Sequence, residues 1–588
     1  MSKRNWLGLI LAVLILSPAW FQGAAAATVD RTGELSGEPA TPKTKAPAAP
    51  GMQEPEATMP TKNLPARPAL KMPDVVVKGE RQFRVTAEKR ELLMLDPMSG
   101  TKEIPSDLAS VAIPGLNTQK GAPAAETVSA KNYLALLEAG GGTSRQGEGR
   151  VVVGQEFESI NYLFQGNYLA GESSDGFGIA PFGQKGSAGL DVRATPLTNL
   201  NLVLSLLGQG ESQRQPVAAS AWGDWLERAN TGVGLQGEWA FASRSNLKVS
   251  GFYQNFEEQG AGASAVPLPQ LDARIVEGKV EYEQNVGHVL NDGLSIWARL
   301  SLDKQDASLS RTPGAGEVSE LKKTLEVVSR FRPATFLLLD AGVQLDDYSG
   351  VNDQSTAHVQ ARVSGILPTG SVLYAETHPG LRWRPVSDWA YEQPHPVVAL
   401  LPGPEEVSAD WHAGWRQNWV GVVSSDVAWF RQDAHATPVW MDANRDGLFE
   451  YVNLDTTHVQ GVQAGLEVRY SGTLSQNANY TYRLADAGSE AHVPYVPQRE
   501  FSTELRWSRT PWEISVGYHY LGERFSLPGS DAATLTPAHL LGSKADYEIT
   551  RGWNVFARLD NMLGSTWEEW SGYPARTFAV LVGMRLSL

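Results

Sequence analysis

The segment DANRDGLFE, residues 442–450, has the residue types and the spacing of a calcium-binding loop. Asp442, Asn444 and Asp446 stand at its first, third and fifth positions, and a glycine follows at the sixth;. The twelfth position holds Asn453 instead of the glutamate that closes such a loop with two oxygens;. Asp-Gly between two β-prone runs is also a common hairpin turn. The segment therefore predicts a hairpin, with a weak calcium site as the alternative.

Other patterns that carry chemistry are missing from the sequence. The 10 histidines stand singly, and no Gly-x-Ser-x-Gly element or phosphate loop is present;. The chain has 0 cysteines, which excludes disulfides, thiolate metal sites and a cysteine nucleophile;. Its formal net charge of -15 provides no basic field for nucleic acid;. We therefore expect a protein without catalytic residues, cofactor or nucleic-acid partner.

The N-terminal part of the chain has the composition of export and tether segments. Residues 1–27 join a positive start to a short apolar run and a small-residue end, which is typical of a signal peptide and too short for a spanning helix;. Residues 28–73 are rich in Pro and Ala and have little apolar surface to bury;. They predict a disordered periplasmic linker, and an unremarkable tail without a partner is the alternative.

From about residue 156 to the end, apolar and polar residues alternate with a period of two;. Tight turns such as 241–244 and 508–511 alternate with long connections such as 303–321, 377–407 and 432–455. This places all short turns at one end of the strands and all long loops at the other, as in outer-membrane barrels with short periplasmic turns. About twenty strands follow residue 156, and a further pair is possible in 128–155.

The final strand has two different faces. Its apolar face consists of Phe578, Val580, Val582, Met584, Leu586 and Leu588. We expect this face to contact lipid, while Arg585 on the other face points into a polar lumen and the strand closes the barrel. The 18 Trp beside 17 Tyr also suit membrane interfaces;. The alternative, a soluble sandwich or propeller, needs repeats of constant length, and the sequence has none;.

Two predicted loops combine Trp, Tyr and acidic residues, SAWGDWLERAN at 220–230 and DWAYEQPHP at 388–396. Aromatic rings at the rim of a barrel anchor it at the membrane interface. We expect this role for both loops, and the alternative is that the rings stack on a bound ligand.

The last 220 or so residues resemble the barrel of TonB-dependent outer-membrane receptors. The family usually has Glu where this chain has Gln463, and it usually ends on an aromatic residue where this chain has Leu588. Four motifs in the family's order carry the resemblance: LLPGPEE at 400–406, FEYVNLDTTHVQGVQAGLEVRY at 449–470, the strand and proline turn around VPYVPQREFSTEL at 493–505, and the closing pair with Asp560-Asn561 and Tyr573-Pro574.

The resemblance implies a barrel of about 22 strands over residues 128–588, in the outer membrane of a Gram-negative bacterium. It also implies outer-membrane lipid, the barrel assembly machinery and the TonB protein as partners. The family's plug domain is not recognisable, because too few residues precede the first plausible strand. Within 74–127, Asp74, Val75, Val76 and Val77 resemble a Ton box, a short strand that pairs with a sheet edge on TonB;. A relic or a simple anchoring strand is the alternative.

We interpret the chain as a barrel of this type that passes a solute across the outer membrane. A barrel of 22 strands leaves a wide lumen, so inward loops, residues 81–127 or another protein must narrow it. The alternative is a non-transporting scaffold or export-machinery component whose lumen holds a partner protein.

Overall fold

The structure is a computed structural model, and the regions that it describes begin at Tyr133. The predicted signal peptide, the linker and the segment 74–127 lie outside these regions. The described residues are 133–143, 146–157, 159–172, 182–214, 225–242, 245–261, 270–286, 294–310, 316–392, 396–397, 403–419, 421–442, 449–488, 492–529, 533–575 and 578–587.

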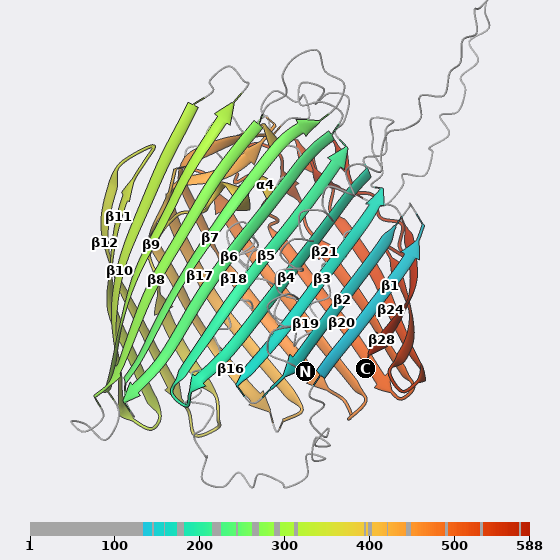
Figure 1. The fold of residues 1–588 in the computed structure, drawn as a ribbon, viewed down its shortest axis with the longest axis horizontal. Helices are drawn as coiled ribbons and strands as arrows, with labels where there is room; N and C mark the ends of the chain where they lie inside the picture. The colour runs from blue at the N-terminus through green and yellow to red at the C-terminus, as the bar shows by residue number, and fades with distance from the viewer. Residues whose placement is uncertain are drawn as a thin grey trace, which may run out of the picture. The chain divides into compact units, whose positions relative to one another are not determined.

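One 24-stranded sheet forms the wall of a closed barrel (Figure 1). Two of its members, β14 and β15, are short pieces within one connection, and the other 22 strands follow one another around the ring in antiparallel pairs, as predicted. The strands are β1 (Tyr133–Gly142), β2 (Gly147–Glu156), β3 (Ile160–Glu172), β4 (Phe182–Leu197), β5 (Leu200–Arg214), β6 (Trp225–Ala242), β7 (Ser245–Ala261), β8 (Gln270–Asn285), β9 (Leu294–Ser310), β10 (Gly316–Ala334), β11 (Leu337–Ser349), β12 (Gln354–Ile366), β13 (Val372–Thr377), β16 (Glu405–Trp419), β17 (Val423–Met441), β18 (Phe449–Arg469), β19 (Leu474–Asp486), β20 (Arg499–Arg509), β21 (Trp512–Leu521), β24 (Ala538–Thr550), β25 (Trp553–Asp560) and β28 (Ala579–Ser587).

The connections at the long-loop end contain small elements of their own. Between β13 and β16 lie β14 (Gly380–Arg382), the helix α4 (Val386–Glu392) and β15 (Pro396–Val397). The hairpin of β22 (Arg524–Phe525) and β23 (Thr534–Leu535) joins β21 to β24, and that of β26 (Glu568–Trp570) and β27 (Tyr573–Pro574) joins β25 to β28. Among the described residues, no helix is long and apolar enough to cross a bilayer.

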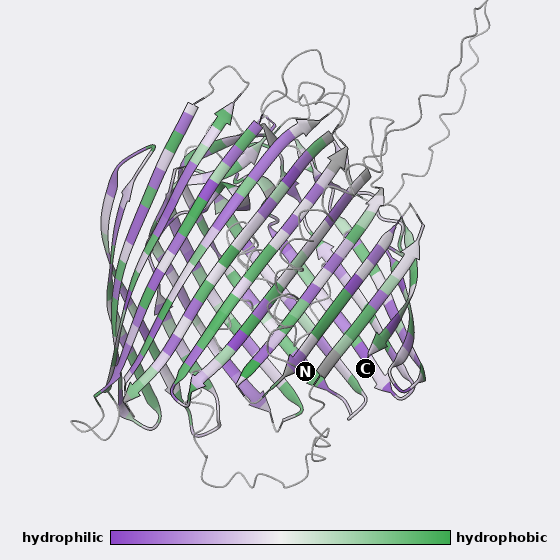
Figure 2. Ribbon diagram, viewed as in Figure 1, coloured by the Kyte–Doolittle hydropathy of each residue, from purple (hydrophilic) through white to green (hydrophobic). Residues whose placement is uncertain are grey.

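Hydrophobic and hydrophilic residues alternate along the strands (Figure 2), and the exposure of the side chains assigns them to an apolar outer face and a polar inner face. On β10, Leu325 and Val327 are 41% and 43% exposed on the outside, while Thr324 and Glu326 are buried toward the inside. A strand places successive side chains on opposite faces, so this pattern repeats around the ring. An apolar exterior around a charged interior is the arrangement of a membrane barrel and the reverse of a soluble sandwich.

The ring closes where β28 pairs with both β25 and β1. Arg585 lies on the inner face, and its Nε donates to Glu138 on β1 at 2.6 Å while its Nη1 donates to Asp546 on β24 at 3.1 Å. On the outer face, Val582 and Met584 are more than half exposed. The seam thus has backbone pairing along its length and an ion pair inside. The remaining predicted members of the apolar face are Phe578, which is exposed just before the strand, Val580 and Leu586, which are half-buried, and Leu588, which is outside the described residues.

Two connections that the alternation predicted as long loops, 303–321 and 432–455, are largely strand. β9 continues to Ser310 and β10 begins at Gly316. The outward residues Lys304 and Asp306 on this stretch form an exposed ion pair at 2.8 Å instead of continuing the apolar stripe. Backbone hydrogen bonds continue the ladder whatever the side chains are, so the strands extend beyond the apolar band that revealed them.

Candidate functional site

The connection between β13 and β16 enters the barrel, and we call its residues 378–392 the inward segment. After Thr377, the amide of His378 still donates to the carbonyl of Asp410 on β16 at 3.1 Å. Short β14 then pairs with the start of β16, with Arg382 opposite Glu405. A Cβ on Gly380 would lie 2.6 Å from Nε2 of Gln344 on β11. Glycine therefore permits the close approach of this backbone to the inner wall.

Side chains of the inner wall hold the backbone of the inward segment. The amide of Leu381 donates to Oδ2 of Asp346 on β11 at 3.1 Å, and its carbonyl accepts from Nζ of Lys322 on β10. Leu381 itself is 2% exposed. A backbone without a strand partner on this side thus finds its donor and acceptor on wall side chains, which lowers the cost of burying it.

Glu320 on β10 is the centre of a second anchor and is 1% exposed. Its carboxylate accepts hydrogen bonds from the hydroxyl of Tyr348, from Nε2 of Gln305 at 2.9 Å and from the indole Nε1 of Trp383 at 3.3 Å. Oε1 of Gln305 in turn accepts from the amide of Val386, the first residue of α4, at 2.7 Å. Three donors compensate the buried carboxylate and link the inward segment to β9, β10 and β11.

The helix α4 connects two separate parts of the wall. Val386 and Ala390, four residues apart and so on one face of the helix, pack against Phe256, Leu271, Ala273 and Ala307 of β7, β8 and β9;. Trp389 packs instead against β17 and β18, with its ring 6.4 Å from that of Trp440 and 4.9 Å from that of Tyr451. Strands β10, β11, β12, β13 and β16 separate these two parts along the ring. α4 is therefore a chord across the lumen, near the long-loop end (Figure 1).

An aromatic cluster extends from α4 across the loops of the C-terminal third. Its rings pack closely, for example Tyr495 on Trp570 at 4.6 Å and Phe449 on Trp570 at 5.4 Å. The members are Trp389, Trp440, Phe449, Tyr451, Tyr495, Trp570 and Tyr573. Burial of each such ring is worth on the order of 2 kcal/mol. The cluster joins α4 to strands β17 and β18 and to the connections β19–β20 and β25–β28.

Arg524 links the connection between β21 and β24 to the one between β25 and β28. It is 5% exposed and donates to the carbonyls of Glu568 and Glu569, and its guanidinium lies 5.2 Å from the ring of Trp567. Burial lowers the pKa of Arg524, while Glu569 and Tyr495 oppose that shift;. Burial also raises the pKa of the Tyr495 hydroxyl, so this group stays neutral. The external connections are thus packed together by apolar and hydrogen-bonded contacts.

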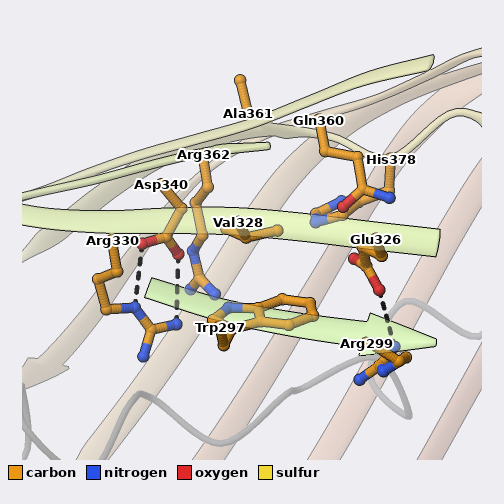
Figure 3. A pocket seen from close by; sticks show the side chains of 10 residues that line it. All are labelled: Trp297, Arg299, Glu326, Val328, Arg330, Asp340, Gln360, Ala361, Arg362 and His378. Carbon is orange, nitrogen blue, oxygen red and sulfur yellow. Dashed lines mark hydrogen bonds and ion pairs between the residues drawn. The ribbon is translucent and has the colours of Figure 1, made fainter. Parts of the chain in front are cut away.

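On the inner wall, a hollow of about 110 Å³ lies between β9, β10, β11, β12 and the first residue of the inward segment (Figure 3). Its charged lining consists of three arginines and two carboxylates. Arg299 donates to Glu281 at 2.8 Å and to Glu326 at 3.0 Å, and Arg330 donates to both oxygens of Asp340. The lining residues are Trp297, Arg299, Glu326, Val328, Arg330, Asp340, Gln360, Ala361, Arg362 and His378.

Comparison with protein families assigns this architecture. Residues 327–562 match the family model described as TonB dependent receptor-like, beta-barrel. The barrel is of the TonB-dependent receptor type. The resemblance seen in the sequence motifs is therefore confirmed, and the matched residues include the whole inward segment. A search of curated proteins finds no match to the chain.

Solved structures share the fold of this TonB-dependent receptor-type barrel. A copper transporter, OprC, superposes with a TM-score of 0.62 at 12% identity, covering 78% of this chain and 81% of that one. The siderophore receptor PirA from Acinetobacter baumannii gives 0.63 at 10% identity over 78% and 80% of the two chains. The FrpB iron transporter from Neisseria meningitidis gives 0.62 at 11% identity over 78% and 81%. At these identities the likeness concerns the fold.

The predicted site residues of this TonB-dependent receptor-type barrel lie apart from the inward segment or outside the description. Asp74, Val75, Val76 and Val77 are outside the described residues, as are Asn444 and Asp446. Asp442 is buried directly after β17, and β17 and β18 pair up to Met441 and Glu450 on either side of that connection. Within the described ranges, no group of three His, Asp or Glu side chains is placed to hold a metal ion.

The prediction of rim anchors was wrong for Trp389, and the sequence pattern did not indicate which of the long loops turns inward. Trp389 is 4% exposed inside the aromatic cluster. The sequence shows a Trp and a Tyr in an acidic loop, which fits a rim position equally well. The available signal was the spacing of Val386 and Ala390, a four-residue apolar repeat in a region where strand alternation is absent;.

Proposed function

We propose that this barrel carries a polar solute across the outer membrane of a Gram-negative bacterium and that the inward segment closes its external mouth. The observation that supports the proposal best is the chord formed by α4, which contacts β7, β8 and β9 through Ala390 and β17 and β18 through Trp389. A 22-strand barrel without an obstruction leaves a wide aqueous channel, which a cell does not tolerate. The inward segment and the aromatic cluster would supply that obstruction from the external side.

The charged inner wall suits a polar passenger. Arg299, Arg330, Arg416 and Arg585 each form an ion pair with a carboxylate on a neighbouring strand. Because both signs of charge line the lumen, it offers hydrogen-bond partners to a hydrated solute along its length. The solved structures of similar fold are titled as a copper transporter, a siderophore receptor and an iron transporter, so we propose a metal ion or a metal chelate as the first class to test.

The test is single-channel conductance in a planar bilayer, with the full chain compared with a variant whose α4 is fixed to the wall. The chain has 0 cysteines, so Ala390→Cys with Ala307→Cys introduces the only two thiols. Both residues belong to the hydrophobic cluster between α4 and the wall, within reach of a short thiol crosslinker. We expect crosslinking to suppress openings and a reductant that cleaves the crosslink to restore them, and the two single-cysteine variants to be insensitive.

Deletion of residues 386–392 removes α4 and so tests the opposite change. We expect this variant to show large and persistent conductance steps. Deletion of residues 28–127 shows whether the N-terminal part adds to closure. If none of these forms conducts ions, the barrel does not transport, and the scaffold that holds a partner protein becomes the better function.

We also propose that Asp74, Val75, Val76 and Val77 pair with a sheet edge of TonB. A proline cannot donate the backbone hydrogen bond that such pairing needs. Val76→Pro should therefore abolish copurification with the periplasmic domain of TonB, whereas Ala46→Pro in the linker should not. Equal capture of both variants would contradict the proposal.

A further inference from the structure

The three arginines of the hollow differ in how much of their hydrogen-bonding capacity the protein uses. Arg299 donates through Nε and Nη1 to two different glutamates. Arg330 holds Asp340 with Nε and Nη2 in a fork, at 3.0 and 3.3 Å. Arg362 on β12 uses Nε alone, toward the hydroxyl of Ser364 at 3.3 Å and Glu376 at 3.5 Å. The two Nη groups of Arg362 are therefore available for a ligand.

The free end of Arg362 points into the hollow. Figure 3 shows its guanidinium directed at the edge of the Trp297 indole, between Asp340 and the middle of the hollow. The side chain is 17% exposed, so its direction is set by its neighbours. A guanidinium presents its two terminal nitrogens in one plane, at the spacing of the two oxygens of a carboxylate.

Both carboxylates of the lining have an arginine partner. Glu326 and Asp340 are each paired with an arginine of the hollow, so they do not repel a further carboxylate as free acids would. Arg362 is the third arginine of the lining, and its contact with Glu376 is made through Nε, at 3.5 Å. A volume of about 110 Å³ equals roughly three to four waters at about 30 Å³ each;. That space accommodates one carboxylate and its adjoining carbon atoms.

The hollow also touches the inward segment, because His378 is one of its lining residues. The ring of His378 stands beside Gln360, across the hollow from Trp297 (Figure 3). A group bound by Arg362 therefore shares the hollow with the first residue of the inward segment.

We infer that this hollow is a binding station for a carboxylate group of the solute, held by the two Nη groups of Arg362 beside the edge of the Trp297 indole. The inference rests on the proposed transport function and names the chemistry of its passenger. It identifies Arg362 as the specificity-determining residue and gives the ion pairs of Arg299 and Arg330 the role of shielding the neighbouring acids.

Equilibrium dialysis of the purified full chain against radiolabelled succinate tests the inference without any need for flux. Arg362→Gln should weaken succinate binding about tenfold or more, because a charge-assisted hydrogen-bonded pair is lost. Arg362→Lys should restore only part of the affinity, since a point charge replaces the planar fork. Arg506→Gln is the matched control: it removes an inner-wall arginine that pairs with Glu513 outside the hollow, and it should leave binding within about twofold;.

Two competitors define the chemistry of the ligand. Unlabelled succinate should displace the label, and succinamide, which has the same shape without the charge, should not. Unchanged binding in Arg362→Gln, or displacement by succinamide, would overturn the inference. Displacement by inorganic phosphate at the same concentration as succinate would overturn the preference for carboxylate. Because dialysis reports binding alone, a barrel that binds succinate but never conducts would refute the transport function and leave the binding station in place.

Discussion

Two regions of the inner wall contain the same kinds of charged side chain, which have different roles in the two regions. At the closing seam, Arg585 and Arg558 pair with acids of neighbouring strands and remain 23% and 29% exposed to the lumen. Under the inward segment, Glu320 and Asp346 are almost fully buried and accept hydrogen bonds from that segment. Strand alternation places charges inward in both regions. The difference is that the inward segment folds back over the second of these regions and covers its charged side chains.

This difference changes the energy at stake. A partly exposed ion pair in water contributes little, because solvent already satisfies both partners. A buried carboxylate that loses its donors, or donors that lose their carboxylate, cost far more. We call the part of the wall under the inward segment the docking wall. Mutations there should therefore cost much free energy, and mutations at the seam should cost little.

The largest expected effect comes from Trp389→Ala. Removing this ring from the aromatic cluster should destabilise the docked inward segment by about 3 kcal/mol, as for buried aromatic truncations in general. Single-channel recording should then show a far higher open probability, and trypsin should cleave after Arg382. Trp553→Ala, which removes a ring that is 45% exposed on the outer face, serves as the control. If the two variants had the same open probability and the same trypsin cleavage, buried and exposed aromatic rings would not differ in how they hold the inward segment.

Glu320→Ala should have the next largest effect, a loss of about 2 kcal/mol, because the hydroxyl of Tyr348, the amide of Gln305 and the indole of Trp383 lose their acceptor. Glu320→Gln keeps one acceptor oxygen and should lie between Ala and the wild type. The open probability of single channels ranks the three proteins. If Glu320→Ala opened no more often than the wild type, the carboxylate would not hold the segment.

Gly380→Ala should destabilise the contact between β14 and the wall by a smaller free energy. Its new Cβ would meet Nε2 of Gln344 at 2.6 Å, and since that amide can shift, the cost should be about 1 kcal/mol;. Faster trypsin cleavage at Arg382 measures the change. At Gly365 a Cβ would be 4.0 Å from its nearest neighbour, so Gly365→Ala should be cleaved at the wild-type rate.

The smallest effect should come from the seam. Arg585→Gln removes an ion pair that is partly exposed, and the backbone pairing of β28 with β1 remains, so the loss should be below about 1 kcal/mol. The midpoint of unfolding in guanidinium, followed by circular dichroism, is the measurement. If the unfolding midpoint of Arg585→Gln shifted as much as the midpoint of Glu320→Ala measured in the same way, the seam and the docking wall would not differ.

Much of the barrel is predictable from local pattern, because outward residues such as Leu325 and Val327 repeat every second position. The pattern fails where the outward positions become charged, as at Lys304 and Asp306, although the ladder continues there. It also fails for the inward segment, whose contacts are distant in sequence: Val386 binds a glutamine 81 residues away. Local alternation contains no information on such a contact.

The connection that contains the inward segment leaves from β13 and returns to β16, and these two strands are adjacent in the ring. Once displaced from the wall, the segment stays covalently attached to the barrel on both sides. It therefore samples only a small volume around its binding position on the wall. Its effective concentration there is on the order of millimolar or higher, as for any short tethered partner. Each opening should therefore end by rapid recapture, which makes passage a succession of brief events rather than a lasting breach of the outer membrane.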